Sequence, residues 1–223
     1  MLETLREDLC SACHMMEEYG LSGILPVNIS AVDRANSLIV TKPADIQPGD
    51  ISSDDFIITD LSGTVVEGSH SVTPGLITHI ELYKAFDSIS SIVHTHSENA
   101  TVWAQAGRDI PPYGITHAGY FRGYIPCTRP LTQAEIENNY EEQLAVSIYE
   151  AFSERGIDFL DIPGALVFNH GPITWGKDAA SAVRHAVILE SIAKMAYRTE
   201  LINPEIMPIN KSVLEKQFLK QHS

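Results

Sequence analysis

Two histidines separated by a single residue, His94 and His96, are the strongest chemical signal in this chain of 223 residues. The segment 91–96 alternates in a way that predicts a β-strand, and a strand directs residues i and i+2 to the same face. Two imidazoles side by side are typical of a site for a divalent metal, which needs a third ligand from elsewhere. The alternative is a chance pair on a half-exposed strand, and the pair alone does not decide between these interpretations.

A third ligand stands at the end of another predicted strand. The apolar run 164–169 ends at His170, directly before a Gly-Pro pair, where a side chain can point from the edge of a sheet into a cleft. Three neutral imidazoles with an open fourth position are the arrangement that holds catalytic zinc. We therefore predict that His94, His96 and His170 bind one divalent cation.

Four other ionisable residues are of interest beside this predicted site. His79 falls within a predicted helix and His117 in a loop, and Glu81 and Glu98 are the nearest carboxylates. A lone histidine is usually satisfied or solvated, and a glutamate on a helix is usually solvated. No role is assigned to these four residues from their types alone.

Cys10, Cys13 and His14 have the spacing of the attachment motif for c-type haem. The cysteines fall within a predicted helix, 2–20, where Cys13 lies on the apolar face, and no export signal precedes them. We interpret them as thiols packed in or beside the core.

The segment 171–178 follows a predicted strand and opens a predicted helix, as a phosphate-binding loop does. It departs from that motif at Asp178, where the Mg²⁺-binding Ser or Thr would stand, and at Pro172, which lacks an amide donor. An aspartate at this place would repel a triphosphate. We interpret the segment as a tight turn followed by a helix with Asp178 as its N-cap.

The elements that must position these residues alternate along the chain. Apolar residues at helical spacing predict helices over 2–20, 76–86, 99–106, 132–155 and 178–200, with a weaker helical pattern after Pro208. Strands are predicted at 37–42, 91–96 and 164–169 and in a hairpin of 56–59 and 64–67, with a loop at 25–30. Because strands and helices are interleaved without a linker or repeat, residues 1–223 are predicted to form one α/β layered domain.

Composition and charge exclude several classes of partner. The chain has 15 basic and 29 acidic residues, a formal net charge of −14 and no run rich in Lys or Arg, which argues against binding to nucleic acid or to an anionic membrane. It is 44% hydrophobic and 20% charged, enough for a sizeable core, and contains no apolar stretch of roughly eighteen residues. Three cysteines and no export signal predict a reduced, cytoplasmic protein.

Seven short motifs follow one another along the chain. They are Asn-Ile-Ser at 28–30, Thr-Lys-Pro at 41–43, Val-His-Thr-His-Ser at 93–97, Thr-His-Ala at 116–118, Tyr-Ile-Pro-Cys-Thr-Arg at 124–129, the stretch 163–172 and Trp-Gly-Lys at 175–177. Taken in this order they resemble the class II aldolase family, and within it most closely the L-ribulose-5-phosphate 4-epimerase branch. The likeness runs from the first helix to about Lys220. It implies a single-domain α/β/α sandwich around a largely antiparallel central sheet, and a homotetramer with active sites between subunits.

The resemblance also implies roles for particular residues. His94, His96 and His170 would hold Zn²⁺ or another divalent metal, whereas Asn28, Lys42 and Thr73 would bind a sugar phosphate: these six residues are the predicted site. In the family reaction, the metal chelates a carbonyl and the adjacent hydroxyl of a ketose phosphate and stabilises an enediolate. A C–C bond is cleaved and, in the epimerases, re-formed with the aldehyde rotated.

The chain departs from the family pattern where the chemistry takes place. The family carboxylate that acts as metal ligand or base is replaced by Gly75, and the aspartate expected after Thr-His-Ala is Gly119. Other departures, Val27, Ala44 and Gln217, lie around the predicted phosphate pocket and the C-terminal region. Each general acid–base group contributes on the order of 10²–10⁴ in rate, so the catalytic acid and base are unassigned.

Three functions are consistent with this pattern. The first is a zinc-dependent sugar-phosphate epimerase or aldolase that uses retro-aldol chemistry. The second is a divergent metal enzyme for another hydroxy-carbonyl compound with a weaker or absent phosphate. The third is a catalytically silent family member, as adducin-like relatives are. The first two predict a small-molecule partner and a metal, and a complete set of three histidines argues against the third.

Overall fold

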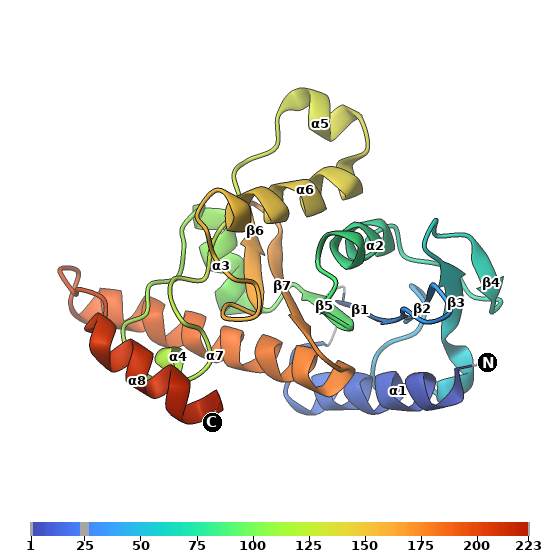
Figure 1. Cartoon of the computed structure of the whole chain (residues 1–223), viewed down its shortest axis with the longest axis horizontal. Helices are drawn as coiled ribbons and strands as arrows, with labels where there is room; N and C mark the ends of the chain where they lie inside the picture. Colours follow the sequence, from blue (N-terminus) through green and yellow to red (C-terminus); the bar gives the residue numbers. More distant parts are fainter. Residues whose placement is uncertain (1, 23–26, 223) are drawn as a thin grey trace.

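The computed structural model describes residues 2–22 and 27–222, which form a seven-stranded sheet between layers of helices (Figure 1). The strands are β1 Val27–Asp33, β2 Leu38–Thr41, β3 Ile57–Asp60, β4 Val65–Glu67, β5 Ser91–Thr95, β6 Gly164–Val167 and β7 Gly171–Gly176. The helices are α1 Glu3–Glu18, η1 Ser53–Asp55, α2 Leu76–Ala85, α3 Glu98–Ala106, α4 Ile115–Ala118, α5 Gln133–Glu137, α6 Tyr140–Ser153, α7 Ala179–Ile202 and α8 Lys211–His222. The strand order is β4-β3-β2-β1-β5-β7-β6, and all neighbouring pairs are antiparallel.

Helices cover both faces of this sheet, with α1 and α7 on one face and α2 and α6 on the other (Figure 1). Leu9 of α1 and Val183 of α7 belong to an apolar cluster on the first side. On the second side, Phe152 of α6 packs edge to face against Trp175 of β7, with ring centroids 5.4 Å apart. The predicted α/β/α sandwich around an antiparallel sheet is confirmed.

The central strand β1 occupies a segment that was predicted to be a loop, 25–30. The first two of these positions lie outside the described residues, but Val27–Asp33 pairs with β2 on one side and β5 on the other. Ile29 packs toward α1 and α7, whereas Ser30 faces α2. The prediction was wrong because short polar residues such as Asn28 also favour turns, and only pairing with distant strands makes this segment extended.

Strand β7 is the second element that the sequence pattern did not predict. The segment 171–178 was interpreted as a tight turn, but Gly171–Gly176 pairs with both β5 and β6. A proline lacks the N–H that a central strand needs, so Pro172 makes this strand hard to predict from the sequence. The helix start was predicted correctly, because Asp178 is the N-cap of α7 and accepts a hydrogen bond of 2.7 Å from Ser181 N.

The single helix predicted at 132–155 is divided in two. Thr132 and Glu135 form the predicted capping box, but α5 ends at Glu137 and α6 begins at Tyr140. Asn139, between them, has φ of +58°, which no continuous right-handed helix accommodates. Helix α6 therefore starts as a separate helix at Tyr140.

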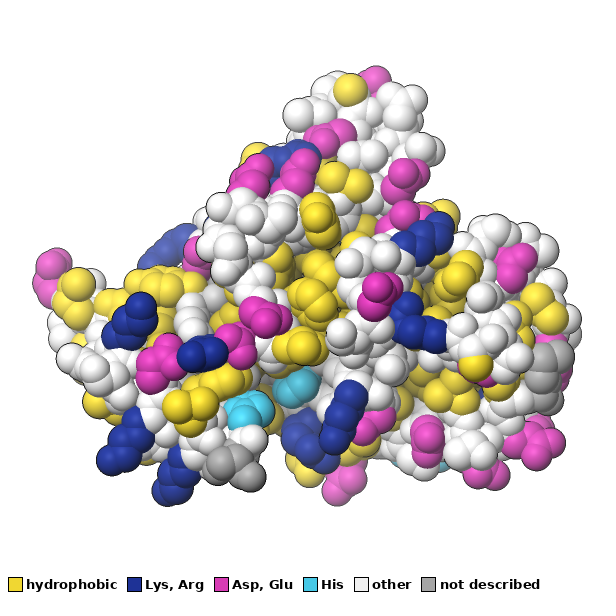
Figure 2. Space-filling view, viewed as in Figure 1, with side chains coloured by type: hydrophobic (Ala, Val, Ile, Leu, Met, Phe, Trp, Pro, Cys, Tyr) yellow, Lys and Arg dark blue, Asp and Glu magenta, His cyan; other side chains and the backbone are white. Residues whose placement is uncertain are grey.

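Charged groups of both signs are interspersed on the face shown in Figure 2, with hydrophobic side chains between them. Arg122 lies 2.9 Å from Asp161 and 2.7 Å from Glu215, and Arg129 forms a similar pair of contacts with Glu135 and Glu150. The described helices include none with the length and apolarity needed to cross a membrane.

Candidate metal centre

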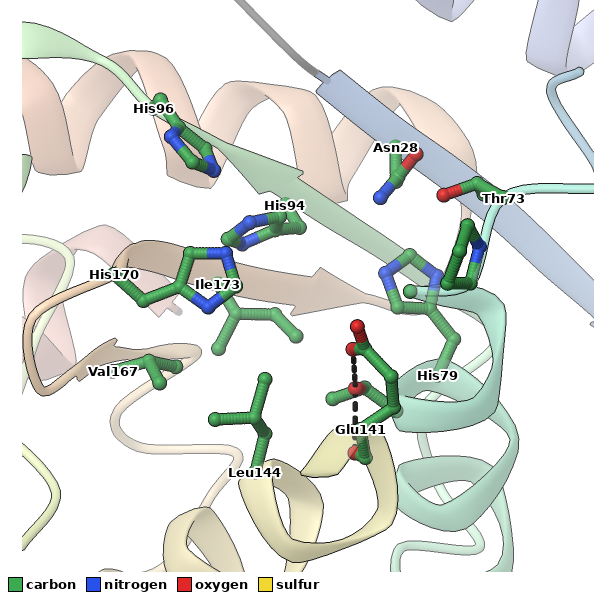
Figure 3. Close-up of a pocket in the computed structure, with 13 residues that line it drawn as sticks. Asn28, Thr73, His79, His94, His96, Glu141, Leu144, Val167, His170 and Ile173 are labelled. Atoms are coloured by element: carbon green, nitrogen blue, oxygen red, sulfur yellow. Dashed lines mark hydrogen bonds between the residues drawn. The ribbon is translucent and has the colours of Figure 1, made fainter. Parts of the chain in front are cut away.

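The three histidines predicted to bind a metal meet at the end of β5 (Figure 3). His94 lies on β5 and His96 just after its last residue, whereas His170 directly precedes β7 in the turn from β6. Because His94 pairs with Ile173 of the neighbouring β7, that turn lies beside the end of β5. The ring centroids are 4.7, 5.0 and 5.1 Å apart, and the ring planes are 76–78° from one another. We call these three residues the His triad.

One ring nitrogen from each member of the His triad faces a common point. One nitrogen of each ring lies within 4.8 Å of the other two. His94 Nδ1 donates to the carbonyl oxygen of Pro172 at 3.0 Å, which leaves Nε2 with a free lone pair. Among the described residues, His94 Nε2 and His170 Nδ1 are buried without a hydrogen-bond partner. Buried acceptors of this kind are costly unless a ligand satisfies them, so the donor set fits a cation.

Burial also favours the neutral form of these imidazoles. Desolvation lowers the pKa of His94 well below its usual value, and the neighbouring charges of His170 and His96 lower it further. Desolvation likewise lowers the pKa of His96 and of His170. The neutral ring is the form that coordinates a metal, and three imidazole nitrogens suit zinc and other late first-row divalent ions.

The His triad opens into a cavity of about 260 Å³ between the sheet and helices α2 and α6. Its wall combines polar groups with an apolar side (Figure 3). Besides the triad, the polar groups come from Asn28, Thr73, Thr78, His79 and Glu141, and the apolar side from Leu144, Val167 and Ile173. A cavity with few polar groups on an apolar wall is typical of a small-molecule site.

Asn28 takes up the space beside Gly75. Asn28 lies on β1 directly opposite His94 of β5, and its amide points into the cavity. A Cβ atom at Gly75 would lie only 2.7 Å from Asn28 Nδ2. The Asn28 amide can therefore occupy its present position because residue 75 is a glycine.

Of the predicted phosphate-binding residues, Thr73 lines the cavity with Asn28, but Lys42 does not. Lys42 Nζ donates to the backbone oxygen of Pro43 at 2.6 Å and also to that of Ile46. The side chain is buried, and desolvation lowers its pKa. The structure thus brings together five of the six predicted site residues and holds the ammonium group of Lys42 on backbone carbonyls.

The carboxylate in the cavity comes from a residue that sequence reasoning missed. Glu141, in the first turn of α6, is the only acidic residue among the described residues that line the cavity. Glu98 is exposed, and Glu81 lies 2.7 Å from Lys84 on the outer side of α2. Glu141 fell inside the single helix predicted at 132–155, and no local pattern indicates that this turn reaches a site formed by β5 and β7.

His79, to which the sequence assigned no role, also belongs to the wall. Its ring is buried on α2, where Nδ1 lies 2.8 Å from Ser30 Oγ, and among the described residues its Nε2 has no partner. Desolvation lowers the pKa of His79 to about 3, so the ring is neutral. His117 and Gly119 belong to the region of α4 and do not line this cavity.

The sequence and the fold match those of known proteins. Residues 7–197 match the Class II Aldolase and Adducin N-terminal domain, and the chain belongs to this family. The predicted family membership is therefore confirmed.

Solved structures agree on the fold. An L-fuculose 1-phosphate aldolase shares 21% identity and a TM-score of 0.83, with 99% of this chain and 97% of that chain covered. The L-fuculose 1-phosphate aldolase from Glaciozyma antarctica PI12 shares 17% identity and a TM-score of 0.79, with coverage of 98% and 81%. The enzyme of the same name from Thermus Thermophilus shares 17% identity and a TM-score of 0.70, with coverage of 92% and 99%. The closer likeness to the 4-epimerase branch stays a prediction.

Proposed function

We propose that this chain is a divalent-metal enzyme that cleaves, and in reverse forms, the C–C bond between the α and β carbons of a small β-hydroxy carbonyl compound. The observation that carries the proposal is the His triad, whose nitrogens converge at the end of a cavity, with His94 Nε2 and His170 Nδ1 buried and unpartnered among the described residues. Zinc is the proposed ion because three neutral imidazoles with an open position are its common catalytic arrangement.

The residues of the cavity have distinct tasks in this proposal. A bound metal would supply Lewis-acid stabilisation of the negative charge that develops on the substrate oxygens. The Pro172 carbonyl fixes the orientation of His94 through its hydrogen bond to Nδ1. Asn28 and Thr73 offer an amide and a hydroxyl to the substrate, and the apolar side formed by Leu144 and its neighbours limits water.

The first version of the proposal takes a sugar phosphate as substrate. Relatives of this fold carry the name L-fuculose 1-phosphate aldolase, and the motifs of this chain resemble the 4-epimerase branch. We therefore propose a retro-aldol reaction on a ketose phosphate such as L-ribulose 5-phosphate, in a cytoplasmic homotetramer. Light scattering of the purified protein tests the tetramer, and a monomer would contradict it.

The second version takes a substrate without a phosphate. It is favoured by Lys42, whose ammonium group donates to the backbone oxygens of Pro43 and Ile46 instead of lining the cavity. A dianionic phosphate needs several charged or backbone donors, and the described cavity wall contains no Lys or Arg. The second version predicts turnover of an unphosphorylated ketose.

Metal analysis and a small substrate panel test the proposal. We expect about one zinc or other divalent ion per purified chain, and aldehyde release from L-ribulose 5-phosphate, L-fuculose 1-phosphate or unphosphorylated L-ribulose. His96→Asn should weaken metal affinity by more than about 100-fold and abolish turnover, because it removes a ligand. His14→Asn, an exposed histidine on α1, is the matched control and should change neither. Absence of bound metal under zinc-replete conditions would contradict the proposal and favour the third function, a catalytically silent family member.

A further inference from the structure

We propose that Glu141 is the proton-transfer residue of this site and replaces the acid–base group that is missing at Gly75. This inference rests on the proposed function, because it assigns a role within the same reaction. It follows from the position of one carboxylate in the cavity and from the way that carboxylate is held.

The first observation is the place of the carboxylate in the cavity wall. Among the described residues of the wall, Glu141 is the only one with a carboxylate. A side chain at Gly75 would meet the Asn28 amide, at 2.7 Å from its Cβ, so a carboxylate there would require the Asn28 side chain to rotate out of its present position. Glu141 points into the same cavity from α6 (Figure 3).

The second observation is that Glu141 is fixed in place across a helix interface. Thr78 of α2 places its hydroxyl 2.7 Å from the backbone oxygen of Glu141 and 3.2 Å from Oε2, and donates its proton to these oxygens. The hydroxyl is part-buried, and α2 and α6 pack against each other over this contact. Thr78 is therefore a positioning residue, which aligns both the first turn of α6 and the carboxylate.

The remaining polar groups of the wall are poorer proton acceptors. Asn28 and Thr73 have no basic group at neutral pH. The ring of His79 is buried and held through Nδ1 by Ser30 at 2.8 Å, so a second proton on it would be a buried positive charge. Glu141 is half-buried and opens on the cavity, which leaves it accessible to a substrate hydroxyl.

The proton-transfer step balances without an added reagent. In the cleavage direction, Glu141 takes the proton of the hydroxyl on the carbon to be released, and that C–O bond becomes the carbonyl of the aldehyde. The electron pair of the broken C–C bond stays on the other fragment as an enediolate. The protonated carboxyl of Glu141 then returns the proton to the enediolate carbon and gives the ketone. The return step alone, run in reverse, exchanges the proton of a hydroxymethyl ketone with solvent.

The test compares Glu141→Gln with Glu142→Gln, the neighbouring half-buried glutamate that does not line the cavity. The probes are the substrate of the panel that the wild type cleaves, and the exchange of dihydroxyacetone phosphate and dihydroxyacetone protons with D₂O. We expect Glu141→Gln to lower kcat for both reactions by about 10²–10⁴-fold with its metal content unchanged. Glu142→Gln should retain wild-type rates.

Two further variants separate proton transfer from a structural role. Formate should restore part of the exchange rate to Glu141→Ala, because it supplies the missing carboxylate, and it should have no effect on Glu141→Gln. Thr78→Val should lower kcat more than it changes KM, whereas Thr78→Ser, which keeps the hydroxyl, should restore it. A structural role would not respond to formate.

The outcomes distinguish this inference from the proposed function. Wild-type turnover with an equally active Glu141→Gln variant would overturn the role of Glu141 and leave the metal enzyme intact. Loss of metal from Glu141→Gln, or no response of Glu141→Ala to formate, would also overturn it. A metal-loaded wild type without cleavage or exchange would overturn the proposed function and this inference together.

Discussion

Gly75 and Asn28 share a space that only one side chain can fill. A Cβ at position 75 would meet Asn28 Nδ2 at 2.7 Å, and that amide is the end of a side chain that can move. We expect Gly75→Ala to change the free energy of unfolding by less than about 1 kcal/mol, because the amide can rotate away. The same rotation removes a polar group from the cavity, so kcat/KM should fall by about tenfold.

A double-mutant cycle checks this coupling. In an Asn28→Ala background the crowded amide is gone, so adding Gly75→Ala should have no further effect on kcat/KM. Steady-state kinetics and urea unfolding of the four proteins give the two quantities. Effects that simply add would show that Gly75 and Asn28 act independently.

Members of the candidate site could be predicted only where their spacing in the sequence indicates that they share a face or an edge of the sheet. His94 and His96 share a face because a strand alternates, and His170 was placed by the end of an apolar run. Glu141 could not be predicted, because Thr78 and Glu141 are 63 positions apart and meet only when α2 packs on α6. The orientation of Lys42 depends on two backbone oxygens that no sequence pattern indicates.

Among the secondary-structure elements, the break between α5 and α6 has a direct link to the cavity. Asn139 has φ of +58°, and Asn is one of the few residues that tolerate this region. Asn139→Ala should lower the free energy of unfolding by about 1 kcal/mol, because a Cβ without a polar partner is disfavoured there. Asn139→Gly should be neutral or slightly stabilising.

The same pair of variants tests whether this break sets the first turn of α6. Urea unfolding measures the free energy of unfolding. A change in kcat reports a displaced Glu141 carboxylate, because Glu141 is the proposed proton-transfer residue. We expect kcat to fall in Asn139→Ala and to stay near the wild-type value in Asn139→Gly. An unchanged free energy of unfolding in Asn139→Ala would contradict the argument from φ.

Elements with strong local signals were predicted, and those defined by distant pairing were not. The β3–β4 hairpin was predicted because Gly63, with φ of +83°, marks its turn, and α7 because Asp178 caps it. Strands β1 and β7 contain polar residues, glycine or proline, and become strands only through their neighbours in the sheet. The architecture could therefore be predicted as a class, but not the strand order that creates the cavity.

The whole molecule should lose stability in mild acid because it buries neutral histidines away from the metal centre. Burial lowers the pKa of His117 to about 4 from 6.5, and Nε2 lies 2.6 Å from the Gly123 carbonyl oxygen. Between these pH values the unfolded chain binds the extra proton and the folded chain does not. The free energy of unfolding should fall as the pH drops below about 6.5, by about 2 kcal/mol from this ring at pH 5, and should not change above it.

Urea unfolding with a chelator present, at pH 7.5 and pH 5, measures this loss. His117→Gln should lose about 2 kcal/mol less than the wild type over this interval, whereas His14→Gln, on the surface of α1, should behave as the wild type does. Equal losses in all three proteins would assign the acid sensitivity to other groups.

The His94–Ile173 pairing has one more consequence for how the protein would acquire its ion. The ladder between β5 and β7 brings the ends of two strands together through backbone hydrogen bonds alone. We expect loading and stripping of the ion to be reversible in the folded state, with far-UV circular dichroism unchanged. The identity of the bound metal would then depend on the concentrations of metal ions around the folded protein, and would not be fixed when the chain folds.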